Sequence, residues 1–257
     1  GGGPRVSLSF NLVERWLGSE VEEAASAGDI KELARLLSED ADTRATGFTG
    51  FGPVHHAAEL GHASAIELLL SSSASARSKT EGGAEAVHLA AAAGHSPVVQ
   101  LLVDRAPGAA RASRGPLRTT PLHIAAAAGN EQLMALLAAS GAEVRARQLD
   151  GAEPLHAAVL GGHLGAVEWL LESRADPEAA DASGLRPLHE AARGGLEALA
   201  QRLFLARADP RATDGEGRAA AYWAARGGQV PMLQWLEVHG LAAGEAAAEA
   251  PAAAEAP

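Results

Sequence analysis

The fold is decided by one ten-residue stretch, Thr120-Pro121-Leu122-His123-Ile124-Ala125-Ala126-Ala127-Ala128-Gly129. Its pattern, an anchor histidine with a glycine six residues later, returns along the chain. The anchors follow one another at intervals of 33, 35, 33 and 33 residues, and they are His55, His88, His123, His156 and His189. A fixed period of this length predicts a stacked array of repeats rather than a single globular core.

Each copy predicts two short helices joined by a turn. A turn-forming stretch precedes the anchor, as in 181–184. Between that stretch and the anchor there is often a proline, which suits the first helical turn. An alanine-rich helix then runs to the glycine, and a second helix carries leucines such as those of 68–70. Pro97 and Pro231 are expected to begin second helices, since proline is tolerated in a first turn.

The outer copies depart from the pattern. In a degenerate first copy over 21–45, Gly28 lies 33 residues before Gly61, and in the last copy Tyr222 takes the anchor position. The link over 103–120 is two residues longer than its counterparts, so its turn is expected to bulge.

The Thr-Pro-Leu-His-x-Ala core of 120–125 resembles the signature of ankyrin-repeat proteins. Gly-His pairs at 61–62, 94–95 and 162–163 strengthen the resemblance, which covers about seven repeats over 21–240 with degenerate repeats at the ends. It implies an all-α fold, an ankyrin-repeat α-solenoid with short β-turn or hairpin tips.

The two ends lie outside the repeats. Residues 1–20 are expected to be an extension that caps the first repeat, and the alternative is a docking arm for a partner. Residues 241–257 are rich in alanine, glutamate and proline, so we expect a low-complexity tail that buries nothing.

Composition excludes several classes of function. The net charge of −11 disfavours nucleic acid as a partner, and no apolar run of 18 residues could span a membrane. Absence of cysteine excludes disulfides, thiolate metal sites and thiol catalysis. We expect a soluble protein inside the cell, in the cytoplasm or in an organelle after removal of a leader. The chain opens without an initiator methionine, so either a leader was removed or the sequence begins mid-chain.

The sequence predicts no catalytic, cofactor or metal site. Histidines on successive repeats are separated by a helix diameter of about 10 Å, whereas zinc ligands converge to about 2 Å from the metal. The resemblance gives the five anchors a structural role, tying each repeat to the next. Signatures of nucleophilic serine, zinc peptidase and phosphate-loop chemistry are missing. We therefore expect neither an enzyme nor a small-molecule substrate.

By the resemblance, a protein partner is bound at the turn tips and at the exposed faces of the first helices, which form a concave face. Carried onto this sequence, those positions are Phe48, Thr49, Phe51, Glu59, Leu60, Leu117, Leu149, Asp150, Leu160, Leu185, Arg193, Glu216, Arg218 and Arg226. Large apolar residues at tips favour protein binding, and the alternative is that they complete the core. Phe48 and Phe51 are the predicted anchors of the partner.

The resulting hypothesis is a non-catalytic scaffold that binds a protein partner. One alternative is a permanent structural subunit of a large multiprotein complex, with an organelle among its locations. A second alternative is the repeat segment of a longer enzyme.

Overall fold

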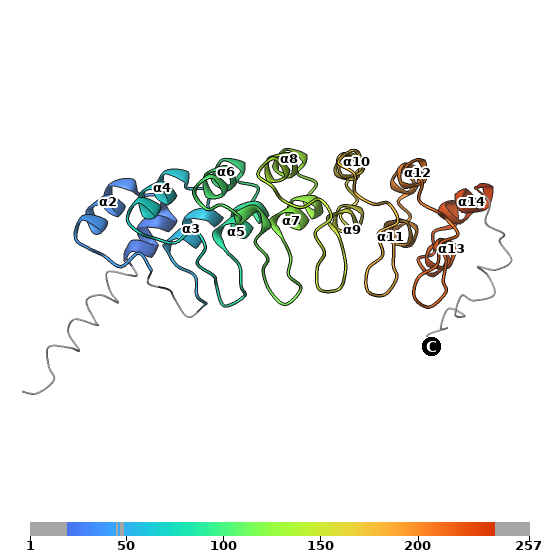
Figure 1. Cartoon of the computed structure of the whole chain (residues 1–257), viewed down its shortest axis with the longest axis horizontal. Coiled ribbons are helices and arrows are strands. Elements are labelled where there is room, and N and C mark those ends of the chain that lie inside the picture. The colour runs from blue at the N-terminus through green and yellow to red at the C-terminus, as the bar shows by residue number, and fades with distance from the viewer. Residues whose placement is uncertain (1–19, 45, 47–48, 240–257) are drawn as a thin grey trace, which may run out of the picture. The chain divides into compact units, whose positions relative to one another are not determined.

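A computed structural model describes residues 20–44, 46 and 49–239 of the 257-residue chain (Figure 1). The predicted N-terminal cap over 1–19, the predicted tail over 241–257 and Phe48 lie outside the described residues. The described part is helical apart from turns and two isolated β-bridges. The all-α prediction is confirmed.

Seven pairs of helices follow one another in the described residues, as the repeat count predicted. The pairs are residues 20–27 with α2 (Ile30–Ser38), α3 (Pro53–Glu59) with α4 (Ala63–Ser71), α5 (Ala86–Ala92) with α6 (Ser96–Arg105), α7 (Pro121–Ala127) with α8 (Glu131–Ala139), α9 (Pro154–Leu160) with α10 (Leu164–Glu172), α11 (Pro187–Gly194) with α12 (Glu197–Leu205), and α13 (Ala220–Arg226) with α14 (Val230–Val238).

The chain divides into two compact modules. The N-terminal module contains the described residues up to Pro121 together with 139–141, and the C-terminal module contains 122–138 and the described residues from 142 onward. Within each module first helices pack on first helices, as α3 does on α5 and α9 on α11, and second helices pack on second helices. Turn tips project from the first-helix side (Figure 1).

Local sequence explains where the helices begin. Pro53, Pro154 and Pro187 open first helices, where the missing N–H costs no helical hydrogen bond. Pro97 and Pro231 stand in the first turns of α6 and α14, which confirms the sequence prediction.

The core of each repeat is narrow and made of small and branched side chains. Within α9 and α10, Leu155, Val159, Val167 and Leu170 are fully buried. Alanines such as Ala158 are equally buried, so neighbouring helices can approach closely. Stacking of neighbours therefore completes a core that no single repeat could build.

Turn glycines hold the repeats in register. Gly61 and Gly129 adopt positive φ, which glycine reaches without strain. A Cβ atom on Gly129 would come within 2.5 Å of the His163 ring, and one on Gly61 within 2.9 Å of the His95 ring. Each glycine is thus required both by its own backbone and by the histidine of the next repeat.

The longer link before α7 contains a structure of its own. A short 3₁₀ helix, η1 (Ala109–Arg111), follows α6, and its alanines Ala109 and Ala110 are buried. Arg111 Nε donates a 2.6 Å hydrogen bond to the carbonyl of Gly141. The extra residues therefore fold back against the protein.

Candidate functional site

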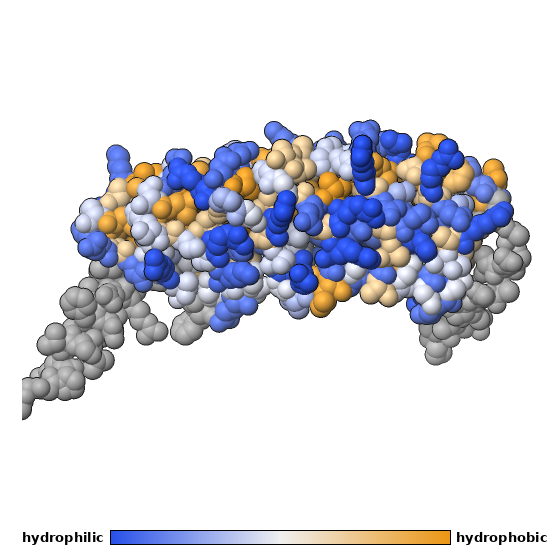
Figure 2. Space-filling view, in the orientation of Figure 1, coloured by the Kyte–Doolittle hydropathy of each residue, from blue (hydrophilic) through white to orange (hydrophobic). Residues whose placement is uncertain are grey.

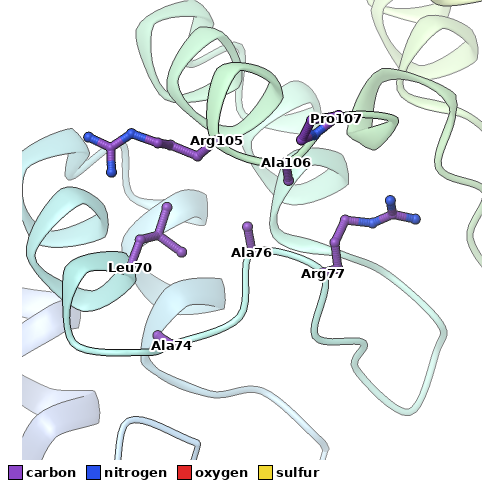
Figure 3. A pocket seen from close by; sticks show the side chains of 7 residues that line it. All are labelled: Leu70, Ala74, Ala76, Arg77, Arg105, Ala106 and Pro107. Carbon is purple, nitrogen blue, oxygen red and sulfur yellow. The ribbon is translucent and has the colours of Figure 1, made fainter.

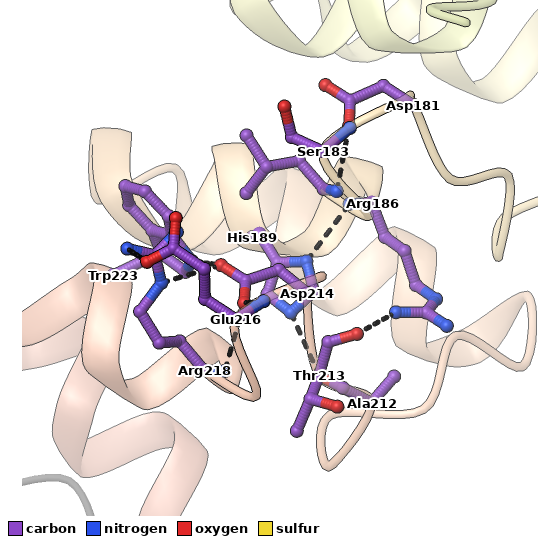
Figure 4. Close-up of polar contacts among 11 residues, drawn as sticks. Asp181, Ser183, Arg186, His189, Ala212, Thr213, Asp214, Glu216, Arg218 and Trp223 are labelled. Carbon is purple, nitrogen blue, oxygen red and sulfur yellow. Dashed lines mark hydrogen bonds and ion pairs between the residues drawn. The ribbon is translucent and has the colours of Figure 1, made fainter.

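The anchor histidines hydrogen-bond to backbone groups of their own repeat and of the following tip. In four repeats the backbone N–H three residues earlier donates to Nδ1, at 3.0 to 3.2 Å. Nε2 therefore carries the proton and donates to a carbonyl of the following tip, at 2.9 to 3.3 Å in all five repeats. His189, for example, bonds Arg186 N and Ala212 O (Figure 4).

Burial keeps these five rings neutral. It lowers the pKa of each anchor below the usual value, and it lowers the pKa of His88 to about 4. In four of the rings both nitrogens are already occupied by backbone groups. Within the described ranges, no three His, Asp or Glu side chains gather in a way that could hold a metal ion.

A second set of histidines links the helix turns. Nε2 of His62, His95 and His163 lies 3.0 to 3.1 Å from the backbone carbonyl 36 residues earlier, in the preceding repeat. These rings are the ones that pack on the turn glycines. The histidines at both places are therefore structural parts of the repeat.

Consecutive turn tips are joined by their backbones. In the N-terminal module Glu81 N donates to Thr49 O at 3.0 Å. In the C-terminal module Ala182 N donates to Asp150 O at 2.6 Å, and Gly215 N donates to Ser183 O at 2.8 Å. The tips are thus a row of mutually supported loops, which presents their side chains in fixed positions.

The N-terminal module carries five of the predicted partner-binding residues in its described part. Thr49, Glu59, Leu60 and Leu117 are exposed. Phe51 is half-buried, and its ring lies 5.8 Å from that of His55 and 5.4 Å from that of His56. This packing means that Phe51 also covers the first anchor.

The C-terminal module exposes two of its predicted leucines strongly. Leu149 at a tip is 66% exposed and Leu160 at the end of α9 is 58% exposed. Figure 2 shows hydrophobic atoms at the tip before α9. Asp150 and Arg193 are exposed as well, whereas Leu185 is half-buried.

Two of the last three predicted residues, Glu216 and Arg218, lie around the buried Asp214 (Figure 4). Asp214 accepts hydrogen bonds from Arg218 Nε at 2.8 Å and from Trp223 Nε1 at 3.1 Å. The Arg218 guanidinium also lies 4.7 Å from the Trp223 ring centre, and its side chain is only 19% exposed. Glu216 and Arg226 remain exposed, whereas the Arg218 side chain is held by its contacts within the last repeat.

Glu190 is a residue that sequence reasoning missed. It directly follows the anchor of α11, a position that carries Ile124 on α7 and Ala157 on α9. Its Oε2 atom is buried, and no described residue hydrogen-bonds to it. Burial raises the pKa of Glu190 to about 8 against the opposing charge of Arg193. In the sequence, Glu190 could have been found as a carboxylate at a position that carries an apolar, aromatic or imidazole side chain in the other repeats.

A pocket of about 380 Å³ lies in the N-terminal module on the side of the second helices (Figure 3). Its two cations are engaged, because Arg77 pairs with the buried Glu85 and Arg105 lies 3.7 Å from Glu67. The lining residues are Leu70, Ala74, Ala76, Arg77, Arg105, Ala106 and Pro107. The pocket therefore offers a small apolar wall rather than a set of converging polar groups.

The helix pairs, their projecting tips and the histidine links define a helical repeat protein. Models of ankyrin repeats match residues 21–112, 107–181 and 195–237. The chain belongs to the ankyrin-repeat family, and its fold is an ankyrin-repeat α-solenoid. Ankyrin repeats generally mediate protein–protein interaction, and such domains are typically non-catalytic interaction modules.

Solved structures match over most of the chain. The ankyrin-repeat domain of Bcl-3, described as a unique member of the IkappaB family, is 25% identical with a TM-score of 0.72, over 84% of this chain and 97% of that one. The ankyrin-repeat domain of human ASB11 is 22% identical with a TM-score of 0.77, over 86% and 98%. Among curated proteins the sequence finds no match.

No helix in the part of the chain that the structure describes has the length and apolar character needed to cross a bilayer.

Proposed function

We propose that this chain is a non-catalytic scaffold that binds a protein partner with its turn tips and the exposed faces of its first helices. The observation that carries the proposal is the exposure of Leu149 and Leu160 on that side of the C-terminal module. Each exposes more than half of an apolar side chain, whereas Leu155 and Leu170 of the same repeat are fully buried. Such exposure has a cost in water that a partner would relieve.

Preorganisation supports the same function. The backbone bonds between tips fix the loops before a partner arrives, so little conformational entropy is lost on binding. In the N-terminal module Phe51 offers an aromatic ring beside Thr49, and we keep Phe51 with Phe48 as proposed anchors for the partner.

The test compares two pairs of apolar side chains. Leu149→Ser with Leu160→Ser should weaken capture of the partner by more than about 1 kcal/mol and leave the thermal midpoint nearly unchanged. Leu205→Ser with Val238→Ser is the matched control, since Leu205 is 63% exposed on a second helix and Val238 is also exposed. The readout is quantitative affinity purification with mass spectrometry. Equal losses for both pairs would contradict the proposed surface.

The same measurement applies to the phenylalanines. Phe48→Ser with Phe51→Ser should reduce capture by more than about 1 kcal/mol. Because Phe51 packs on His55 and His56, a drop in the thermal midpoint without loss of capture would assign it to the core instead.

A further inference from the structure

Within the C-terminal module, a carboxylate stands in the proposed binding face without a counter-ion. Glu190 is half-buried on α11, and no described residue forms an ion pair or hydrogen bond with it. A buried carboxyl group without a partner is costly, and natural proteins keep such groups mainly where they serve a purpose.

The charges around Glu190 are mostly negative. Asp181, from the tip before α11, and Asp150, from the tip before α9, both act to raise the pKa of Glu190. Arg193, one turn later on α11, acts in the opposite direction, and within the described residues it forms no ion pair with Glu190. The equivalent positions on α9 and α13 carry Ala157 and Trp223, which have no charge.

The surroundings leave room for an incoming side chain. Ala157 occupies the position equivalent to Glu190 on the neighbouring helix α9. An alanine methyl group covers less of the surface there than a longer side chain would. The exposed leucines Leu149 and Leu160 belong to the same repeat as Ala157, and the exposed Asp150 adjoins Leu149.

We propose that this face binds a segment of the protein partner that carries a lysine or arginine, whose cationic group pairs with Glu190 while adjacent apolar side chains contact Leu149 and Leu160. The inference rests on the proposed function and adds the chemistry of the partner. Charge complementarity supports it, because a cation would meet the carboxylates of Asp150 and Asp181 on two neighbouring tips and the carboxyl group of Glu190 on α11. Pairing would also give the Glu190 carboxyl group the partner that it lacks in the free protein.

Proton release is a signature of this mode of binding. Glu190 is largely protonated at pH 7, since burial raises its pKa to about 8. A cation that pairs with the carboxylate lowers this pKa, so the carboxyl proton leaves to the buffer when the complex forms. Binding should therefore strengthen as the pH rises from about 6 to 8.

The experiment begins with a selection of random decapeptides displayed on phage, against the full chain at pH 7.5. Enriched peptides should share a lysine or arginine at one fixed position next to apolar residues. The same selection against Glu190→Gln should lose that preference, whereas selection against Glu197→Gln should keep it. Glu197 is the matched control, as an exposed glutamate on α12 of the same module.

Affinity measurements then assign the contact. For the most enriched synthetic peptide, replacing its basic residue with glutamine should weaken binding to the native chain at least about tenfold, but less than about twofold to Glu190→Gln. Calorimetry of the native chain at pH 7 should show an enthalpy that depends on the ionisation enthalpy of the buffer. Glu190→Gln should not show this dependence.

Three outcomes separate the ideas. Coupling between Glu190 and the basic residue, with proton release, supports the inference. Enriched peptides that lack a basic position, or that bind Glu190→Gln equally well, overturn it and leave the proposed function standing. A selection that enriches no peptide on either variant counts against both.

Discussion

At the scale of single residues, the best preserved side chains serve the fold. Each anchor histidine bonds the following tip through Nε2, and in four repeats Nδ1 also accepts a bond from the backbone of its own repeat. The ring must be neutral to accept at Nδ1, and burial ensures this by lowering its pKa. An imidazole at this position is therefore a joint between repeats, with no lone pair left for a metal.

Removing one joint should destabilise the protein. His123→Ala leaves the half-buried Ala152 carbonyl without its donor, so we expect a loss of roughly 1–3 kcal/mol in the free energy of unfolding, measured by urea denaturation. Added chelator should leave the thermal midpoint of the native chain unchanged. A midpoint that fell with chelator would show that a metal stabilises the fold.

The anchors also predict how stability depends on pH. Their folded-state pKa values lie below the unfolded value of about 6.5, so below that pH the unfolded chain binds protons that the native chain does not. The stabilisation is complete above pH 6.5 and is lost as the pH falls towards the lowered values. The urea midpoint should therefore be lower at pH 5.5 than at pH 7.5.

Glu190 opposes this trend and must be removed from the measurement. Its pKa of about 8 means that the native chain holds a proton which the unfolded chain releases near its ordinary value of 4.5. That contribution weakens stability as the pH rises between those values. Glu190→Gln is the appropriate background, and a midpoint that stayed flat or rose from pH 7.5 to 5.5 would contradict the role of the histidines.

At the scale of elements, three repeats carry a histidine in the turn between their helices, whereas Asp29, Asn130, Leu196 and Gln229 hold that place in others. His62, His95 and His163 precede second helices and bond the carbonyl 36 residues earlier. Leu196 holds the same place before α12 with φ −86° and ψ 72°, against −82° and 73° for His62. Gly162, in the turn that such a histidine would contact, has nothing within 4 Å of a built Cβ.

Leu196→His should install the missing link. The backbone already has the geometry of the other turns, so the new ring is expected to donate to the carbonyl of Leu160. We expect about 0.5–1.5 kcal/mol of added stability in urea denaturation. The converse change, His163→Leu, should cost a similar amount by removing the bond to Ala127 O. A destabilised Leu196→His would show that the apolar contact of leucine matters more.

At the scale of the whole molecule, stability is local to neighbouring repeats. Within each module, neighbouring helix pairs contact one another, and the last pair, α13 and α14, contacts α11 and α12. Asp214 accepts four hydrogen bonds there, from the backbones of Glu216 and Arg218 and from the side chains of Arg218 and Trp223. These bonds keep the pKa of Asp214 low, although burial by itself would raise it.

Loss of this cluster should therefore be felt near the C-terminal end. Asp214→Ala should speed amide hydrogen exchange in α13 and α14 by the equivalent of about 2–3 kcal/mol, while amides of α3 to α6 keep their protection. Asp209→Ala, at an exposed aspartate that caps one backbone N–H, is the matched control and should have little effect. Faster exchange in both modules would show that the chain unfolds as one cooperative unit.

The sequence by itself determined the repeat architecture. Each repeat packs on its neighbours in the same way, so it needs the same types of residue at the same positions. The anchors, the turn glycines and the first-turn prolines could all be placed by spacing, and the binding role of the tips follows only by analogy. The state of individual side chains could not be predicted. Phe51 covers two histidines, Arg218 is committed to Asp214, and Glu190 lacks a partner. Those outcomes depend on neighbours contributed by other repeats, so only the tertiary structure decided them.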